Sequence, residues 1–283
     1  VKGKKNMDKN KKIPYKLKPF FEEESIANFK DVTLYLPISL ENKYCTGVYF
    51  KQIVENVLFF ITNGLDIFQN NKPLSISKIR IDIGDTLHRH NIIETNEKLK
   101  FEKSLKMGTD WVFNNIDIIN KLLPEKNKIN TETELRDDIT ILTNKSAEMP
   151  DLEIIRHEYW RKKPQFDIIR QKIENLCMIP NSPIEHSFNS EAEKFFEIKQ
   201  KYYRNIDKNQ TITQSKIYLK EEAAILPILY NETPNAIELY PGGENYFSIA
   251  FRSKKAKKDK NVQDFLSNGL KGADKRKNVK IYV

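Results

Sequence analysis

Apolar strands and amphipathic helices alternate along the first half of the sequence, and this order is the strongest constraint on its fold. Residues 32–38 form an apolar run typical of a buried strand, and residues 47–61 have apolar positions three and four apart, as in a helix. A second strand is predicted at 77–85, where apolar and polar residues alternate, and a long helix from about residue 94 to 123. Strand, helix, strand and helix in succession favour parallel βαβ units.

The rest of the chain continues this pattern after a polar segment at 124–149, which we interpret as an exposed insertion with a short strand at 139–142. We expect one α/β domain over residues 19–251, Rossmann-like, with a mostly parallel sheet flanked by helices. The other predicted elements are strands at 152–155 and 236–240 and helices at 166–176, 191–204 and 213–229.

Positive charge is concentrated at the two ends of the chain. The sequence has 283 residues and a net charge of +9; residues 1–18 carry +7 and residues 252–283 carry +8, which leaves −6 for residues 19–251. We interpret residues 1–18 as a flexible basic leader and residues 252–283 as a basic tail. Such ends are either solvated or bind polyanions without sequence preference, and charge alone does not separate the two.

The composition favours a cytoplasmic protein without a membrane anchor. No apolar run approaches the roughly 18 residues that a membrane-spanning helix needs, and the amino-terminal stretch has no signal-peptide apolar core. Cys45 and Cys177 provide neither a disulfide framework nor metal-ligand spacing. His88 and His90 are close in sequence but lack further ligands. These patterns predict no metal site, and we also expect no cofactor and a monomeric protein.

Ser39 lies at the junction between the first predicted strand and a polar turn. Open α/β sheets bind ligands at the carboxyl ends of their strands, so the Ser39 hydroxyl is expected at the ligand-binding edge of the sheet. The competing interpretation is a helix cap, because Ser is a preferred N-cap residue. The sequence has no Gly-x-Ser-x-Gly around Ser39 and no Gly-rich loop for dinucleotides or phosphates. A nucleophile-elbow hydrolase is therefore disfavoured.

Tyr218 and Glu222 are four residues apart on a predicted helix, so their side chains share one face. The pair is either an ordinary surface pair or a small polar clamp. In a clamp, the carboxylate accepts hydrogen bonds from a substrate ammonium group, and the phenol accepts a hydrogen bond and relays a proton.

Four short segments occur in the order and approximate spacing of a known family. They are residues 37–44 (Pro-Ile-Ser-Leu-Glu-Asn-Lys-Tyr), residues 85–91 (Asp-Thr-Leu-His-Arg-His-Asn), the pair Tyr218 and Glu222, and residues 239–241 (Leu-Tyr-Pro). Together they resemble the tRNA-dependent cyclodipeptide synthases over about residues 30 to 250.

The resemblance implies a Rossmann-like fold similar to the catalytic domains of class I tyrosyl- and tryptophanyl-tRNA synthetases. It implies two aminoacyl-tRNAs as partners and substrates, and a cyclic dipeptide (a diketopiperazine) as the product. Ser39 matches the nucleophile that carries the acyl group, Tyr218 and Glu222 match the residues that hold its amino group, and Tyr240 matches the tyrosine of the dipeptidyl step.

The resemblance also implies residues that position the substrate. Tyr240 and Pro241 resemble the subfamily whose signature ends in Tyr-Pro, whereas Asn42 falls where the other subfamily carries its Asn, so the signature is mixed. In the family, the helix after the second strand has a basic face for tRNA phosphates; ordinary solvated helix charge is the alternative. The matching residues here are Arg89, Lys98, Lys100, Lys103 and Lys106.

The implied chemistry agrees with the absent phosphate loop. An aminoacyl ester on tRNA is already activated, so transfer to a serine hydroxyl exchanges one ester for another and needs no ATP; the acyl-enzyme divides the reaction into easier steps. The general base stays open among Tyr218, Tyr240 and the tRNA ribose. Two other functions stay open as well, a non-catalytic RNA-binding protein and, less favoured, a serine esterase.

Overall fold

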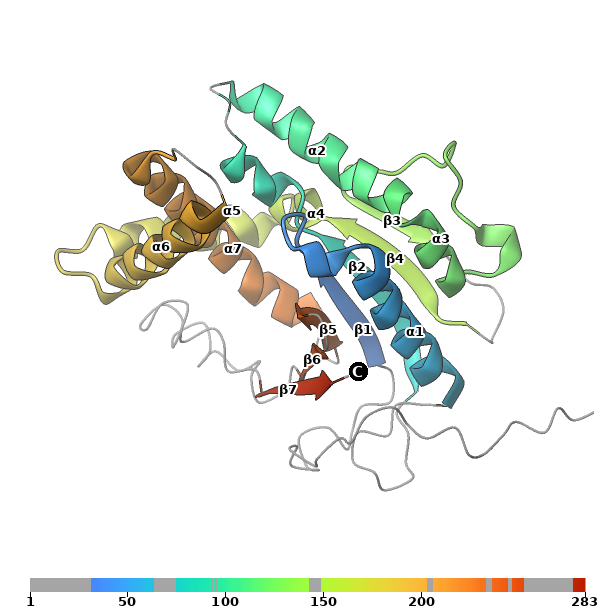
Figure 1. Cartoon of the computed structure of the whole chain (residues 1–283). Helices are drawn as coiled ribbons and strands as arrows, with labels where there is room; N and C mark the ends of the chain where they lie inside the picture. Colours follow the sequence, from blue (N-terminus) through green and yellow to red (C-terminus); the bar gives the residue numbers. More distant parts are fainter. Residues whose placement is uncertain are drawn as a thin grey trace, which may run out of the picture.

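Within the part of the chain that the structure describes, seven strands form one sheet, and helices cover both of its faces (Figure 1). This computed structural model describes residues 32–63, 75–92, 94, 96–142, 149–202, 206–232, 236–243, 246–251 and 277–282. The strands are β1 (Val32–Ile38), β2 (Ile76–Ile83), β3 (Ile139–Leu142), β4 (Asp151–Arg156), β5 (Ala236–Gly243), β6 (Tyr246–Phe251) and β7 (Lys277–Tyr282). The α-helices are α1 (Gly47–Asn63), α2 (Glu97–Asn114), α3 (Ile116–Ile119), α4 (His157–Arg161), α5 (Pro164–Cys177), α6 (Pro183–Tyr202) and α7 (Lys208–Glu232). Short 3-10 helices are η2 (Lys43–Cys45), η3 (Thr86–Asn91), η4 (Asn120–Leu122) and η5 (Glu125–Asn127).

The four central strands of the sheet run parallel, and the outer strands run antiparallel. The strand order is β3-β4-β2-β1-β5-β6-β7, in which β1 pairs with β2 and β5, and β2 pairs with β4. The antiparallel pairs are β3 with β4, β5 with β6, and β6 with β7. A parallel centre built from strand–helix–strand units confirms the predicted Rossmann-like α/β fold. None of the described helices is both long enough and apolar enough to span a membrane.

The prediction of one long helix from residue 94 to 123 is wrong, because the helix is interrupted at Asn115. Helix α2 ends at Asn114, and the shorter α3 and η4 follow. The Asn115 side chain is buried, and its Oδ1 accepts hydrogen bonds from the Gly47 backbone N–H at 3.1 Å and from the Thr46 hydroxyl at 3.2 Å. Asn115 thus satisfies an otherwise unpaired N–H at the start of α1, a contact that no local pattern reveals.

The carboxyl-terminal prediction needs two corrections. Strand β5 continues past Tyr240 to Gly243 and pairs with β6, a strand that the sequence patterns did not predict. Residues 277–282, placed in the predicted basic tail, form β7 at the edge of the sheet. The predicted leader at 1–18 and residues 252–276 of the tail lie outside the described residues.

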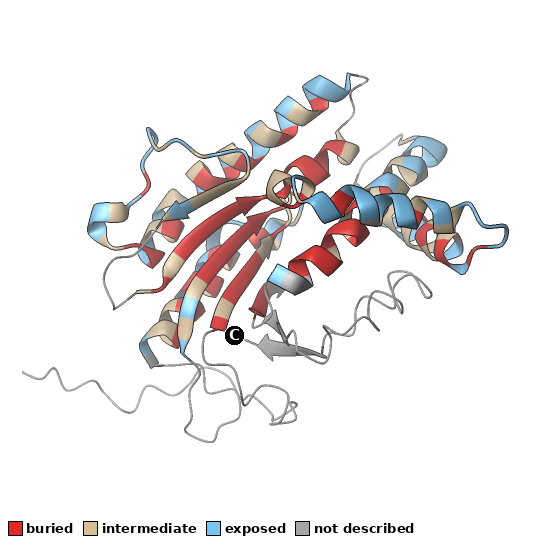
Figure 2. Cartoon of the chain, turned by 180° about the vertical axis from the view of Figure 1, so that it is seen from behind, coloured by how far each residue is buried: buried red, intermediate tan, exposed pale blue. Residues whose placement is uncertain are grey.

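One face of the sheet forms an apolar core with α1, α2 and α3. On β2 the side chains of Ile79, Ile81 and Ile83 all belong to this core, as the alternation of a strand requires. From the helices, Phe50 and Trp111 pack against each other with ring centroids 5.0 Å apart. Figure 2 shows the central strands as mostly buried.

The other face of the sheet packs against α4 to α7 and is more polar. Its apolar contacts include Tyr35 of β1, Trp160 of α4 and Phe188 of α6. Between the core isoleucines, β2 places Arg80 and Asp82 on this face, both buried. Buried polar groups are costly unless they are hydrogen-bonded, so a strand that carries two of them on one face indicates a site.

Candidate active site

A pocket of about 380 Å³ lies at the carboxyl ends of the central strands, between the sheet and α7. Its wall includes the four residues to which the sequence resemblance assigns a catalytic role: Ser39, Tyr218, Glu222 and Tyr240. These residues come from the end of β1, from α7 and from β5, so the fold brings together positions about two hundred residues apart. The location agrees with the rule that open α/β sheets bind ligands at this edge.

Ser39 directly follows β1, and it does not cap a helix. The capping residue in this turn is Asn42, whose side chain accepts a hydrogen bond from the Tyr44 backbone N–H at 3.0 Å at the start of η2. The Ser39 carbonyl accepts from the Asn42 N–H at 3.1 Å, which closes the turn. The interpretation of Ser39 as a cap is therefore excluded for the described helices, and its side chain lines the pocket.

Asn42 connects the Ser39 turn to β5. Its Nδ2 donates a hydrogen bond to the Tyr240 hydroxyl at 3.1 Å. Burial raises the pKa of Tyr240 to about 12, so this phenol keeps its proton at neutral pH. The structure thus unites Asn42 and Tyr240, the two residues that made the subfamily signature mixed. Pro241 follows within β5, opposite Phe247 of β6.

Tyr218 and Glu222 lie side by side on the part of α7 that faces the pocket. Burial raises the pKa of the Tyr218 phenol well above its ordinary value, and the neighbouring Glu222 and Tyr240 raise it further. Tyr218 is therefore a neutral phenol that can both donate and accept a hydrogen bond. The pair is part of the pocket wall, which excludes the alternative of an ordinary surface pair.

Glu221, adjacent to Glu222, is a buried anchor that the sequence patterns did not single out. Its carboxylate accepts two hydrogen bonds from Arg89, at 3.1 and 2.7 Å, and lies 2.8 Å from His90 Nε2 and 3.0 Å from His157 Nε2. Arg161 adds an ion pair at 3.2 Å. These groups come from η3 and α4, so Glu221 fixes the rotation of α7 and with it the side of the helix that presents Tyr218 and Glu222.

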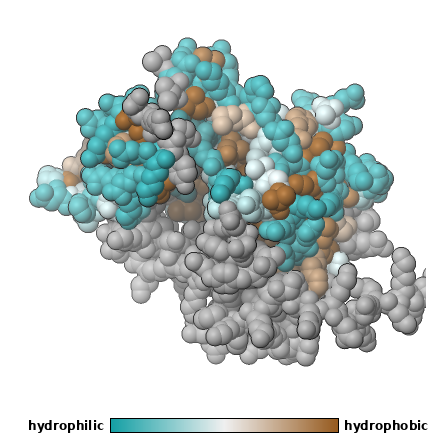
Figure 3. Space-filling model, viewed as in Figure 1, coloured by the Kyte–Doolittle hydropathy of each residue, from teal (hydrophilic) through white to brown (hydrophobic). Residues whose placement is uncertain are grey.

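This arrangement corrects two of the predicted tRNA contacts. Arg89 is buried in the bidentate pair with Glu221 and is not part of a surface patch. Lys100 is also buried, and its Nζ contacts Glu97 at 2.8 Å. Lys98, Lys103 and Lys106 do lie on the surface of α2. Hydrophilic residues cover much of the described part of the face drawn in Figure 3.

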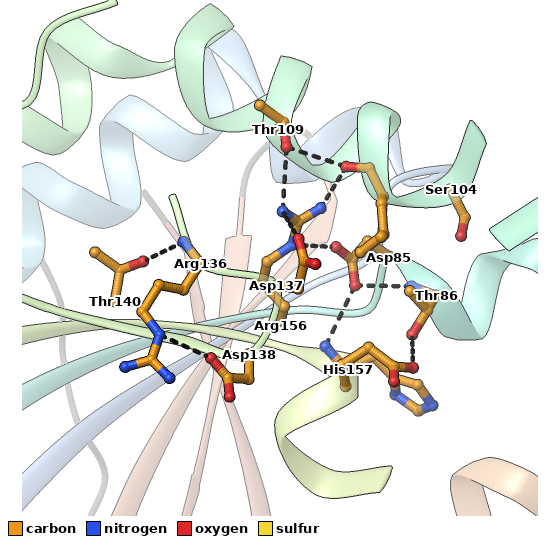
Figure 4. Close-up of polar contacts among 12 residues, drawn as sticks. Asp85, Thr86, Ser104, Thr109, Arg136, Asp137, Asp138, Thr140, Arg156 and His157 are labelled. Carbon is orange, nitrogen blue, oxygen red and sulfur yellow. Dashed lines mark hydrogen bonds and ion pairs between the residues drawn. The ribbon is translucent and has the colours of Figure 1, made fainter. Parts of the chain in front are cut away.

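Asp85 connects the ends of β2 and β4 through its buried carboxyl group. Its carboxyl group is fully buried, contacts the Arg156 guanidinium, and accepts from the backbone N–H groups of Thr86 at 2.7 Å and His157 at 3.3 Å (Figure 4). Gly108 of α2 packs closely here, since a Cβ atom at that position would lie 2.5 Å from Asp85 Oδ2. Asp85 therefore ties α2, the start of η3 and the start of α4 together.

Several polar residues of the pocket were missed at the sequence level. Asp82 accepts hydrogen bonds from the Tyr35 hydroxyl and from Trp160 Nε1, the latter at 2.8 Å. Strand alternation provided a signal for Asp82, because it separates this residue from the isoleucines on either side. His157 also had a signal, since it directly follows a strand at the same edge as Ser39. Among the other polar wall residues, Glu41, His88 and Asn91 lie in the segments that carried the resemblance but were given no role, and Glu238 was not singled out.

Glu221 predicts an acid-sensitive contribution to stability. Burial alone raises its pKa, but the hydrogen bonds from His157 and His90 and the Arg89 charge outweigh burial, so its pKa in the folded protein is far below its usual range. An acid with a depressed folded pKa stabilises the fold above its unfolded pKa, about 4.3 for Glu, and loses that contribution as the pH falls. We expect the free energy of unfolding to fall by about 1.4 kcal/mol per pH unit from this group below pH ~4.

Urea unfolding between pH 7 and 3 measures this effect. The Glu221→Gln variant is less stable at pH 7 but lacks this part of the acid dependence, whereas Glu102→Gln, at an exposed site on α2, retains the wild-type slope. Parallel slopes for the wild type and Glu221→Gln would contradict the assignment.

Comparison with known proteins finds similarity in three-dimensional structure but not in sequence. No protein-family profile matches the sequence, and no curated protein sequence matches it. Among solved structures, a CDPS (cyclodipeptide synthase) from Fluoribacter dumoffii is similar with a TM-score of 0.53 and 16% identity, over 75% of this chain and 78% of that one. A cyclodipeptide synthase from Candidatus Glomeribacter gigasporarum bound to Phe-tRNAPhe gives 0.48 and 16%, over 76% and 88% of the two chains. AlbC, a cyclodipeptide synthase from Streptomyces noursei, gives 0.45 and 8%, over 74% and 81%. The similarity to the Fluoribacter dumoffii structure shows that the chain has the fold of the cyclodipeptide synthases.

Proposed function

We propose that this protein is a cyclodipeptide synthase that joins the aminoacyl groups of two aminoacyl-tRNAs through an acyl-enzyme on Ser39. The observation that carries the proposal is the composition of the pocket wall: a serine at a strand end, a Tyr–Glu pair on one helix turn and a tyrosine on the adjacent strand. These are the same four residues to which the sequence resemblance assigns roles. The matching fold supports the same conclusion.

The first step acylates the enzyme. The Ser39 hydroxyl attacks the ester carbonyl of an aminoacyl-tRNA, a new ester forms on Oγ, and the ribose hydroxyl leaves with the proton. Tyr218 and Glu222 hold the amino group of the bound aminoacyl chain, which fixes its orientation for the next step. The amine then attacks the second aminoacyl-tRNA, and a dipeptidyl ester remains on Ser39.

The last step releases the product without water. The free amine of the dipeptidyl chain attacks the ester on Ser39, a second amide bond closes the ring, and Oγ regains a proton. Tyr240, held by Asn42, lies in the wall of the same pocket and keeps its own proton at neutral pH. It can therefore orient the dipeptidyl group as a hydrogen-bond donor.

Two mass measurements test the proposal. Purified protein incubated with a charged tRNA pool should gain the mass of an aminoacyl group, and the solution should contain a cyclic dipeptide; uncharged tRNA is the control. Expression in a bacterial host, with analysis of the medium, then identifies the amino acids incorporated. Salt-sensitive binding of tRNA without an adduct or product would establish the non-catalytic RNA-binding alternative instead.

The exposed lysines of α2 are proposed to contact tRNA phosphates. Lys98 and Lys106 have side chains 85% and 74% exposed, and each lysine of the set Lys98, Lys103 and Lys106 has an acidic neighbour on or near the helix. Such exposed ion pairs are worth at most about 1 kcal/mol, so a phosphate can displace them.

Replacing Lys98, Lys103 and Lys106 together by Glu should weaken tRNA binding and lower the slope of log K against log salt by about 1 for each lost phosphate contact. Filter binding at several salt concentrations measures this slope. The matched control carries the same change at exposed lysines of α5 and α6, namely Lys172, Lys194 and Lys201. Equal slopes for both triple variants would remove α2 from the tRNA surface.

A further inference from the structure

His157 directly follows β4, as Ser39 directly follows β1, and the two residues occupy matching positions at the ends of their strands. In the parallel pairing, Ile38 is opposite Ile83, and Ile83 is opposite Arg156. The next residue of each chain segment is therefore Ser39, Gly84 or His157, at one level along the edge of the sheet. All three line the pocket. With strands about 4.8 Å apart, the Cα atoms of Ser39 and His157 are separated by roughly 10 Å.

The residue between them has no side chain. Gly84 directly follows β2, and its N–H donates to the Ile38 carbonyl at 3.0 Å. Gly84 therefore places no side chain between Ser39 and His157, both of which line the pocket. An aminoacyl group esterified to Ser39 Oγ carries its amine three bonds from that oxygen, and the free amine of the dipeptidyl group attacks the ester carbon bonded to the same oxygen, so both amines react close to Ser39.

Glu221 determines which nitrogen of His157 carries the proton. His157 Nε2 lies 3.0 Å from Glu221 Oε1. The burial of this carboxylate is outweighed by its donors, which hold its pKa well below the usual range, so Glu221 accepts and His157 Nε2 donates. In the neutral ring the lone pair is then on Nδ1. Asp85 fixes the same residue from the other side by accepting its backbone N–H at 3.3 Å.

We propose that His157 is the proton acceptor for the substrate amine, with Glu221 as its positioning residue. This assignment rests on the proposed function. At ring closure the amine nitrogen forms a bond to the ester carbon, the C–Oγ bond of Ser39 breaks, and the amine proton passes to His157 Nδ1 and from there to Oγ. When the first amide bond forms, the amine of the Ser39-bound aminoacyl group gives up its own proton to His157 Nδ1 in the same way, and that proton passes to the departing ribose oxygen of the second tRNA. His157 and the amine-holding Glu222 are positioned together, because Glu221 and Glu222 are successive residues of α7.

His90 provides a matched control. Its Nε2 contacts the same carboxylate at 2.8 Å, but His90 is not part of the pocket wall. A glutamine at either position can keep a donor near Glu221 through its amide N–H, while it removes the ring lone pair. Replacement at His157 therefore tests proton transfer. Replacement at His90 tests whether the loss of one histidine contact to Glu221 is enough to impair the reaction.

The experiment follows two signals with charged tRNA, the mass of the acyl-enzyme and the release of cyclic dipeptide. We expect His157→Gln to acylate Ser39 within about threefold of the wild-type rate but to release product about 100-fold more slowly, the scale of general base catalysis, so that acyl-enzyme accumulates. His90→Gln should release product within about threefold of wild type. For His157→Ala, added imidazole should restore product release, which a purely structural defect would not allow.

Two results would overturn the assignment while leaving the function intact: product release by His157→Gln at the wild-type rate, or loss of Ser39 acylation in that variant with a wild-type unfolding midpoint. A wild-type protein that forms neither acyl-enzyme nor cyclic dipeptide would overturn the proposed function, and this assignment with it. The acylation signal of the wild type thus separates the two failures.

Discussion

The Ser39→Ala variant should form no covalent aminoacyl adduct and should make cyclic dipeptide about 10⁴-fold more slowly or worse, the scale on which loss of a covalent nucleophile acts. The hydroxyl is the only group of Ser39 that alanine removes, and the proposed reaction passes through an ester on that oxygen. The side chain is half-buried and caps no described helix, so its loss should change the free energy of unfolding by less than about 0.5 kcal/mol. Lost activity therefore reports chemistry and not unfolding.

Intact-protein mass spectrometry after incubation with charged tRNA measures the adduct directly. Ser75→Ala is a suitable control, because Ser75 is exposed and precedes β2 at the opposite edge of the same sheet. It should acylate normally. A Ser39→Ala protein that still acquires the aminoacyl mass would show that another residue carries the acyl group, and the proposed mechanism would be wrong.

The sequence predicted the centre of the fold well because the signals there are local. Val32–Ile38 was expected as a strand from its apolar run, and β1 has these bounds. By contrast, the break of the helix at Asn115 depends on hydrogen bonds to Thr46 and Gly47, almost seventy residues away. Such long-range contacts do not change the spacing of apolar residues along the sequence, so that spacing overestimates the length of the helix.

The residues of the site also fall into those that a local sequence pattern predicts and those that depend on distant contacts. Ser39 was found because a strand end is a recognisable place for a ligand, and the structure gives it a pocket. Glu221 was not found, because a glutamate next to another glutamate on a helix has the appearance of solvated charge. Its role follows from Arg89 and His157, which approach it from two other elements. Buried polar networks are therefore the part of this site that only a three-dimensional arrangement reveals.

Removing Asp85 should cost about 3–5 kcal/mol of folding free energy, the usual effect of breaking a buried ion pair by deleting one partner. Asp85→Ala leaves the Arg156 guanidinium buried without its main carboxylate, and it leaves the N–H groups of Thr86 and His157 without their acceptor. The comparison is with Asp110→Ala on α2, which breaks a 2.7 Å pair with Lys106, a side chain 74% exposed. That change should cost less than about 1 kcal/mol, since water solvates both charges.

Urea denaturation at neutral pH measures both values, with the slope m checked for a common unfolding transition. Asp85→Asn separates charge from hydrogen bonding, because its amide oxygen can still accept from the backbone N–H groups; we expect a loss between those of the two alanine variants. Equal stabilities for Asp85→Ala and Asp110→Ala would mean that water reaches Arg156 in solution. The strand ends beneath Ser39 and His157 would then not be held by a buried ion pair, and the rigid spacing between the two residues would lose its structural basis.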